Sequence, residues 1–270
     1  FIKFFKKFMM NNFNNKVWIA LPVYNEWPAI KSLIENLLNL LDKEFGNYEI
    51  VICNDGSNDK SEIYFKELVN NKNITLIEHD FNRGLAESIR DIFEYVSFNS
   101  KNDDVLVRMD GDATHNPIYI IDMIKKINDG YDVVVAARTK SNDQNLPYSR
   151  RLFSFIARYF IKIFYRLPKL IEYTGGFRAY KMSILHKAFN FYKGSFIQLG
   201  SFGFVCTFEK LVKLSLIKAK FGEVPFTLQY ENKTGKSKMV PWITILGYII
   251  LIPIIYFPKT GWKSRTKGFN

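Results

Sequence analysis

The sequence predicts an α/β fold in which a mostly parallel sheet carries helices on both faces. Three observations lead to this fold class. Short apolar stretches alternate with segments whose apolar residues recur at helical spacing, from Val17 to about residue 137. The short stretches are apolar nearly throughout, which is typical of strands covered on both sides. With 270 residues, 47% of them hydrophobic, the chain can bury a large core.

Strands and helices are expected to follow each other in pairs along the first half. The apolar stretches predict strands at 17–21, 48–54, 74–78, 105–109 and 132–137. Helical spacing of apolar residues predicts helices at 29–45, 61–70, 85–96 and 118–129. Such units connect parallel strands by right-handed crossovers. Ligands then gather beyond the carboxyl ends of the strands, and the chemistry is expected there.

The second half has a different pattern. Residues 149–167 predict a basic amphipathic helix, and residues 203–216 predict another helix. Residues 174–180 indicate a glycine turn that enters an aromatic stretch. Residues 219–230 indicate strands near a sheet edge, because Pro225 cannot donate to a β-ladder.

Three regions are expected along the chain. Residues 1–16 mix Phe, Met and Lys and predict a basic tail, either extended or as a short helix on a membrane surface. Residues 17–239 carry the predicted sheet. Residues 240–270 combine a hydrophobic segment with a basic tail, and the uncharged run at 240–258 is just long enough to span a bilayer. The run favours membrane association, in the interface plane or as one span, with a buried core helix as the alternative.

Charge is divided unevenly between the two halves. Residues 1–130 carry 15 Lys/Arg against 20 Asp/Glu, and residues 131–270 carry 23 against 6, so their net charges are −5 and +17. A basic second half favours an anionic partner: nucleic acid, a phosphorylated substrate or anionic lipid. Cys53 and Cys206 lack metal-ligand spacing and favour a reducing, cytosolic setting.

Carboxylates recur where the expected strands finish. Asp55 follows the strand at 48–54, and Asp110 and Asp112 follow the strand at 105–109. Residues two apart in an extended segment point to the same side, so Asp110 and Asp112 are expected to face one cavity. Two bare carboxylates repel each other, and a divalent cation between them removes that conflict. Oxygen ligands favour Mg²⁺ or Mn²⁺, which complete their shells with phosphate oxygens.

Seven motifs occur in an order and at spacings that resemble family 2 glycosyltransferases, of the dolichyl- or polyprenyl-phosphate mannosyltransferase type. They are PVYNE (22–26), NDGSND (54–59), NRGLAESIR (82–90), MDGDATHNP (109–117), TGGFRAY (174–180), EVPFTL (223–228) and GKSKM (235–239). The resemblance implies a GT-A catalytic domain at 17–239. It also implies a metal-dependent, inverting transfer of a sugar, mannose first among candidates, from a nucleoside diphosphate sugar to a polyprenyl or dolichyl phosphate.

The resemblance assigns the nucleotide sugar to side chains at the strand ends. The expected set is Pro22, Tyr24, Asn25, Glu26, Asp55, Asp110, Arg178 and Glu209. In the family, the first four match the loop at the base and ribose, and Asp55 matches the carboxylate that binds the base. Asp110 and Asp112 match the metal ligands, and Asp112 is also expected to be catalytic. The family often has Gln where this chain has Thr114, so a third side-chain ligand is not expected.

The resemblance assigns the acceptor phosphate to basic residues of the second half. The expected set is Arg138, Arg150, Ser154, Lys236 and Lys238, of which the first three are also expected to act in catalysis. A lipid phosphate has a second pKa of about 6, so near neutrality it is already a nucleophile. It needs cations to hold it rather than a base. Lys233 stands where related enzymes often carry an arginine.

The expected partners are GDP-mannose or UDP-glucose, a polyprenyl or dolichyl phosphate, and the cytoplasmic face of a membrane, held peripherally or by one span. Nucleic acid is not expected. Two alternatives stay open. A family 2 transferase acting on a saccharide hydroxyl needs a base, for which Glu209 is the late candidate. A non-catalytic protein would bind membrane or nucleic acid through the basic half, although no RNA-reading motif is present. His115 is expected to cap or pack locally rather than act as a base.

Overall fold

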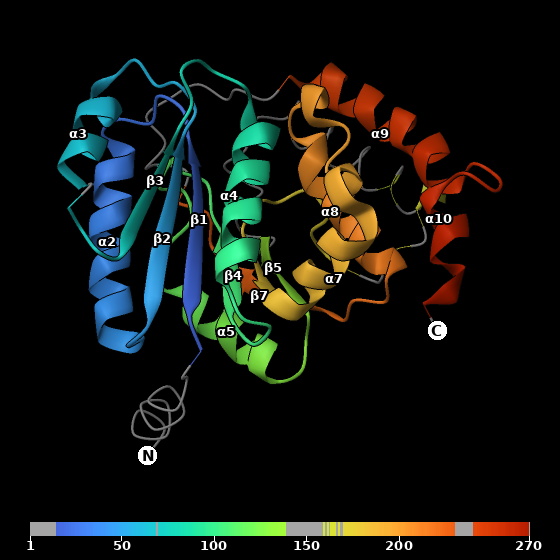
Figure 1. Cartoon of the computed structure of the whole chain (residues 1–270), viewed down its shortest axis with the longest axis horizontal. Helices are drawn as coiled ribbons and strands as arrows, with labels where there is room; N and C mark the ends of the chain where they lie inside the picture. Colours follow the sequence, from blue (N-terminus) through green and yellow to red (C-terminus); the bar gives the residue numbers. More distant parts are fainter. Residues whose placement is uncertain are drawn as a thin grey trace.

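The computed structural model of the chain describes residues 15–68, 70–138, 159, 161, 163–165, 167, 170–229 and 240–269. Within these ranges a seven-stranded sheet has the order β3-β2-β1-β4-β6-β5-β7 (Figure 1). The strands are β1 (Val17–Val23), β2 (Tyr48–Asn54), β3 (Ile74–Glu78), β4 (Val105–Arg108), β5 (Val133–Arg138), β6 (Arg178–Lys181) and β7 (Phe221–Phe226). The predicted α/β class is confirmed.

Helices fill the connections between the strands. The α-helices are α2 (Ala29–Glu44), α3 (Lys60–Leu68), α4 (Leu85–Asn99), α5 (Tyr119–Asn128), α7 (Met182–Tyr192), α8 (Val205–Leu216), α9 (Pro241–Tyr256) and α10 (Trp262–Arg265). Short 3₁₀ turns are η2 (Lys193–Phe196), η3 (Gly200–Phe202) and η5 (Thr266–Gly268). The expected helix at 149–167 and the tail at 1–16 lie mostly outside the described residues.

The sheet is parallel except at one strand. β1 pairs in parallel with β2 and β4, and β5 pairs in parallel with β7 at the edge, where Pro225 predicted it. β6 lies between β4 and β5 and runs antiparallel to both. Its first residue, Arg178, lies opposite Arg108, the last residue of β4. The reversed strand therefore delivers its beginning to the edge where its neighbours end.

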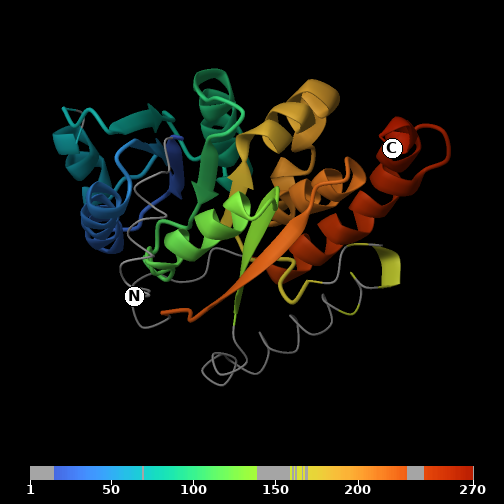
Figure 2. The ribbon, with the colours of Figure 1, turned by 90° about the horizontal axis from the view of Figure 1, so that it is seen from below.

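Alternating residues of β1 divide the core into two clusters. Trp18 and Ala20 pack in one cluster with α4, α7 and α8. Val17, Ile19 and Leu21 pack in the other cluster with α2 and α5. The helices that contribute to the two clusters lie on the two sides of the sheet (Figures 1 and 2). Since both faces are covered, the strands are apolar at nearly every position.

Helix α7 was not expected from the sequence. It begins directly after β6, and its N-cap residue Lys181 makes no side-chain capping bond. Ser, Thr, Asp or Asn at that position would have marked the helix start. Residues 182–192 were assigned no element from the sequence.

The hydrophobic run near the C-terminus forms α9, which packs against the domain. Tyr248, Leu251 and Ile255 are buried in the core cluster that contains α8. A side chain at Gly247 would lie 2.4 Å from a methyl carbon of Val205, so the two helices approach closely at the glycine. In the described part of the chain, none of the helices has the length and apolar character needed to cross a membrane.

Candidate active site

The carboxyl ends of the parallel strands meet at one edge of the sheet. The loop after β2 joins the end of β1, because the amide of Asp55 donates to the carbonyl of Val23 (2.8 Å). The loop after β4 joins β1 through the amide of Met109, which donates to the carbonyl of Ala20 (3.0 Å). The loops after β2 and β4 are thus both joined to β1 at this edge.

Asn25 fastens the loop after β1 to the loop after β2. Its amide donates to Ser57 Oγ (3.0 Å), and its side chain exchanges two hydrogen bonds of 2.9 Å with Asn58. The φ angle of Asn25 is 51°, in the left-handed region that asparagine tolerates better than most residues. The predicted loop at the base and ribose is therefore a rigid double loop, in which Tyr24 and Glu26 are partly exposed and Pro22 is buried.

Asp55 is buried and already holds a third loop. Its carboxylate accepts from the amides of Arg83 (2.8 Å) and Gly84 (2.9 Å). The ring of His79 lies between Asp55 (2.7 Å) and Asp91 (2.8 Å). A carboxylate offers about four lone-pair sites, so contact with a nucleotide base would use the remaining capacity. That contact stays a prediction.

Asp110 lies between a buried arginine and a buried histidine. Arg108 Nη2 is 2.5 Å from Asp110 Oδ1. The amide of Asp110 donates to Nδ1 of His115 (3.3 Å), whose ring stacks on Phe177 at 5.0 Å. Burial lowers the pKa of His115, although the two aspartates oppose the decrease. His115 is therefore a neutral, packed residue near pH 7, as the sequence predicted.

Asp112 is oriented by the next turn of chain. Its Oδ1 accepts from the hydroxyl (2.7 Å) and the amide (3.2 Å) of Thr114. Ala113 between them has a φ of 55°, a strained conformation for a residue with a Cβ. Thr114 thus holds the carboxylate of Asp112 instead of standing beside it as a separate ligand.

The two aspartates fit a divalent cation in their chemistry. Carboxylate oxygens are the ligands that Mg²⁺ and Mn²⁺ take. Across the described ranges, no group of three or more His, Cys, Asp and Glu side chains is placed to hold a metal ion. Two carboxylates suit a site whose other ligands are substrate phosphates and water. Asp110 and Asp112 would be the residues that hold it.

Arg138 and Glu172 form an ion pair at the end of β5. Nε and Nη2 of Arg138 lie 3.0 and 2.8 Å from Glu172 Oε2. The other carboxylate oxygen accepts from the amide and hydroxyl of Thr174 and from the amide of Gly175. Burial alone raises the pKa of Glu172, but Arg138 and Thr174 outweigh it and lower the pKa to about 2. The predicted phosphate ligand Arg138 is therefore fixed in place by a carboxylate that the sequence did not single out.

The ion pair predicts acid sensitivity. Because the pKa of Glu172 falls from 4.5 to about 2 on folding, its contribution is present above pH 4.5 and is lost as pH falls toward 2. That contribution is on the order of 3 kcal/mol, of which about 2 kcal/mol is lost between pH 6 and pH 3. Urea unfolding of the wild type and of Glu172→Gln at both pH values measures this. The variant should lose about 2 kcal/mol less on acidification, and equal losses would contradict the assignment.

Arg178 and Glu209 are held inside the protein. Arg178 donates to the carbonyls of Thr207 and Tyr173, both at 2.7 Å. Glu209 is fully buried beside Lys213 and accepts from the amides of Gln198 and Leu199 at 3.0 Å. The expected positions near the sugar or acceptor stay predictions: the structure shows that both side chains are buried and have protein partners among the main-chain groups around them.

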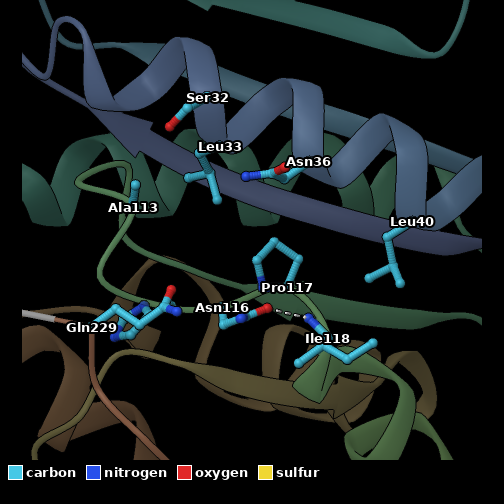
Figure 3. Close-up of a pocket in the computed structure, with 10 residues that line it drawn as sticks. Ser32, Leu33, Asn36, Leu40, Ala113, Asn116, Pro117, Ile118 and Gln229 are labelled. Carbon is cyan, nitrogen blue, oxygen red and sulfur yellow. Dashed lines mark hydrogen bonds between the residues drawn. The ribbon is translucent and has the colours of Figure 1, made fainter. Parts of the chain in front are cut away.

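A groove of about 390 Å³ adjoins the loop after β4 on the side of α2 (Figure 3). It is lined by Ser32, Leu33, Asn36, Leu40, Ala113, His115, Asn116, Pro117, Ile118 and Gln229. The side-chain oxygen of Asn116 accepts from the backbone amide of Ile118 (3.0 Å) just before α5. The backbone amide of Gln229 donates to the carbonyl of Thr114 (3.0 Å). The groove wall therefore supports the turn that carries Asp112.

The remaining predicted ligands of the acceptor are Arg150, Ser154, Lys236 and Lys238, with Lys233 beside them. All five lie outside the described residues. Three buried residues at the site were not predicted: Arg108, Glu172 and Lys210. The signal for Arg108 is a charged residue at the end of an otherwise apolar strand, and for Glu172 it is an acid two residues before Thr-Gly-Gly.

Comparison with protein families gives one match over most of the chain. The model described as "Glycosyl transferase family 2" matches residues 18–189. This range contains the strand ends with Asp55, Asp110, Asp112 and Arg138.

Curated relatives include lipid-phosphate transferases. The chain is 28% identical over 229 residues to a dolichol-phosphate mannosyltransferase of Pyrococcus furiosus, covering 83% of this chain and 59% of that protein. It is 28% identical over 129 residues to an undecaprenyl-phosphate 4-deoxy-4-formamido-L-arabinose transferase of Proteus mirabilis, covering 48% of this chain and 39% of that protein. The chain thus spans about 40–60% of the length of these relatives.

Solved structures share the fold. Glucosyl-3-phosphoglycerate synthase of Mycobacterium tuberculosis, with Mn²⁺, UDP and phosphoglyceric acid, matches with a TM-score of 0.61 and 14% identity. The match covers 89% of this chain and 78% of the synthase. The same enzyme with Mg²⁺ and UDP gives a TM-score of 0.60, with coverage of 88% and 80%.

Proposed function

The chain belongs to glycosyltransferase family 2, and on this premise we propose that it transfers a sugar, mannose first among candidates, from a nucleoside diphosphate sugar to a polyprenyl or dolichyl phosphate. One observation carries the proposal: Asp110 and Asp112 follow β4 at the same sheet edge where Arg138 ends β5. One edge of the sheet therefore carries two carboxylates suited to a metal ion on the donor diphosphate, and an arginine suited to the acceptor phosphate.

The donor is proposed to lie over the ends of β1, β2 and β4. The double loop held by Asn25 provides a rigid wall for the nucleoside, with Tyr24 and Glu26 partly exposed on it. Asp110 and Asp112 hold the diphosphate end through the cation. A divalent cation bound there supplies charge neutralisation for the leaving nucleoside diphosphate.

The acceptor is proposed to be a phosphate rather than a hydroxyl. A hydroxyl acceptor requires a carboxylate base, and the late candidate Glu209 is fully buried beside Lys213. His115 is also buried, and burial lowers its pKa. A phosphate monoester with a second pKa of about 6 needs no base near neutrality. The burial of Glu209, the late candidate base, therefore favours the lipid phosphate, and His115 is buried as well.

Arg138 is proposed to orient the acceptor phosphate together with Arg150, Ser154, Lys236 and Lys238. Its pairing with Glu172 fixes the direction of the guanidinium before the acceptor arrives. A fixed cation loses less conformational entropy on binding than a free side chain. Glu172 in this scheme is a positioning residue for Arg138.

The outer face of α9 is proposed to lie in the membrane interface. One face of this helix is buried against α8, yet Trp242, Leu246 and Ile249 on the helix are exposed. The basic residues Lys263 and Arg265 follow in α10. Apolar side chains beside basic ones suit the interface of an anionic membrane. Such a placement would keep the sheet edge near a lipid acceptor.

Serine at Trp242 and Leu246 together is expected to weaken membrane binding. Without these two apolar side chains, the free energy of membrane binding should weaken by roughly 2 kcal/mol, which is about a thirtyfold lower partition coefficient. Flotation with vesicles of anionic and neutral phospholipids measures the partition. Phe98→Ser is the matched control, because Phe98 is 87% exposed on α4 and should not affect flotation. Equal flotation of all three proteins would reject the interface.

A transfer assay tests the function directly. Membranes containing the protein are incubated with Mg²⁺ or Mn²⁺ and with radiolabelled GDP-mannose, UDP-glucose or other sugar nucleotides. Label that enters the organic phase as an acid-labile lipid product supports the proposal. Label that appears only in polysaccharide supports a hydroxyl acceptor, and absence of any labelled product with every donor would reject a transferase.

A further inference from the structure

Behind the two aspartates the structure gathers positive charge that the proposed transfer does not use. Arg108, Arg178 and Lys210 are all buried. Nε of both arginines and Nζ of Lys210 have no hydrogen-bond partner within the described ranges. Nζ of Lys210 lies 4.8 Å over the ring of Phe93. Unpaired buried cations are costly, so this arrangement calls for an explanation in the site itself.

The three cations influence one another. Arg108 and Arg178 lie directly opposite each other across β4 and β6, a position where like charges repel. Burial lowers the pKa of Lys210 to about 7, and both arginines add to the decrease. Arg178 donates only to neutral carbonyls. Of the three, Arg108 has the one ionic contact in the part of the chain that is described, and its partner is Asp110.

The contact leaves one side of Asp110 open. The Arg108 side chain is 2% exposed and the Asp110 side chain is 30% exposed. The 2.5 Å contact lacks the alignment of a hydrogen bond, because Nη2 counts among the unpaired atoms. Gly176 leaves room for the guanidinium, since a Cβ at that position would lie 1.2 Å from Nη1. The arginine therefore approaches Asp110 from the interior, while a cation and its phosphate would arrive from outside.

We propose that Arg108 is a positioning residue that makes divalent-cation binding at Asp110 depend on the diphosphate of the donor. The inference rests on the proposed function. The charge of Asp110 is partly offset by Arg108, and Arg178 and Lys210 add positive potential, so a divalent cation alone is bound weakly. The negative charges of a diphosphate reverse this balance. Because coupling is reciprocal, the cation raises the affinity for the nucleotide by the same factor.

Mn²⁺ binding measured by electron paramagnetic resonance tests the proposal without turnover. Each protein is titrated with Mn²⁺ alone and with Mn²⁺ in saturating GDP or UDP. The coupling factor is the ratio of the two dissociation constants. For the wild type we expect about a hundredfold. Arg108→Gln removes the charge and keeps a donor toward Asp110. It should lower the factor about tenfold, mainly by tightening the binding of Mn²⁺ alone.

Two further variants separate charge from shape and from folding. Arg108→Lys keeps the charge and should stay within about threefold of the wild-type coupling factor. Lys210→Met removes an amine that does not touch Asp110 and that is about half protonated near pH 7, so it should lower the factor by up to about threefold even if Arg108→Gln fails to fold. Asp110→Asn should abolish the nucleotide-dependent Mn²⁺ site, which identifies the site being measured.

The outcomes distinguish this inference from the proposed function. If Arg108→Gln folds and keeps the coupling factor of the wild type, the role of Arg108 is overturned and the proposed function is not. If Arg108→Gln does not fold, an unchanged coupling factor in Lys210→Met has the same meaning. Equal coupling factors for Arg108→Lys and Arg108→Gln also overturn it, because charge would then have no part. If the wild type binds no Mn²⁺ in the presence of GDP and none in the presence of UDP, the proposed function and this inference are both overturned.

Discussion

Replacement of Asp112 by asparagine is expected to lower sugar transfer on the order of 10³-fold while the protein stays folded. The carboxylate of Asp112 is proposed to hold the cation that neutralises the leaving diphosphate, and an amide cannot offer the same charge. Asparagine keeps the oxygen that accepts from the hydroxyl and amide of Thr114. The free energy of unfolding should therefore change by no more than about 1 kcal/mol.

Thr114→Val is the matched control for this variant. It removes the hydroxyl that lies 2.7 Å from Asp112 but keeps the carboxylate. Transfer should fall by about tenfold or less, because the ligand remains and only its orientation loosens. Initial rates at saturating donor and urea unfolding curves are measured for both variants. Turnover of Asp112→Asn within threefold of the wild type would exclude the metal role proposed for Asp112.

Alanine at Gly176 is expected to destabilise the protein by about 3 kcal/mol or more. The added Cβ would lie 1.2 Å from Nη1 of Arg108. That guanidinium is buried against Asp110, so moving it aside disrupts its one ionic contact within the described residues. In a protein of this size, the loss corresponds to a thermal midpoint roughly 6–12 °C lower.

The neighbouring glycine gives the control. A Cβ at Gly175 would lie 3.1 Å from Cγ of Glu172, a contact that a small shift relieves, so Gly175→Ala should cost about 1 kcal/mol. A double-mutant cycle localises the cause of the larger effect. In an Arg108→Ala background, Gly176→Ala should add little further loss, because the clashing atom is gone. Additive losses in the cycle would show that the clash with Arg108 is not responsible.

Periodicity predicted most of the fold in the first half of the chain. The strands at 48–54 and 74–78 have the expected bounds, and the helix at 29–45 is one residue shorter as α2. In β2 and α2 the apolar side chains are the ones that the fold buries, so the spacing of apolar residues reports these elements directly. The direction of β6 could not be predicted, because an apolar alternation is the same read either way. The antiparallel pairing of β6 with β4 and β5 in the structure reveals it.

The sequence predicted the carboxylates of the candidate site but not the residues that contact them. Asp55, Asp110 and Asp112 were identified because acidic residues at the ends of apolar strands are conspicuous in one dimension. Arg178 and Glu209 look identical in sequence whether they face a ligand or a carbonyl, and the structure places both inside. Glu172 lies 34 residues from Arg138, so their pairing depends on how the chain returns to the sheet.

The reversed direction of β6 has a consequence for how the family can diversify. The chain leaves the sheet edge at Arg138 and comes back to it at Glu172, and the two ends are tied together by an ion pair. Between these two residues the chain also enters the core, where Ile161, Tyr165 and Leu170 are buried in the cluster that contains α8. A replacement of this connection would therefore have to preserve its buried residues as well as the ion pair that closes it.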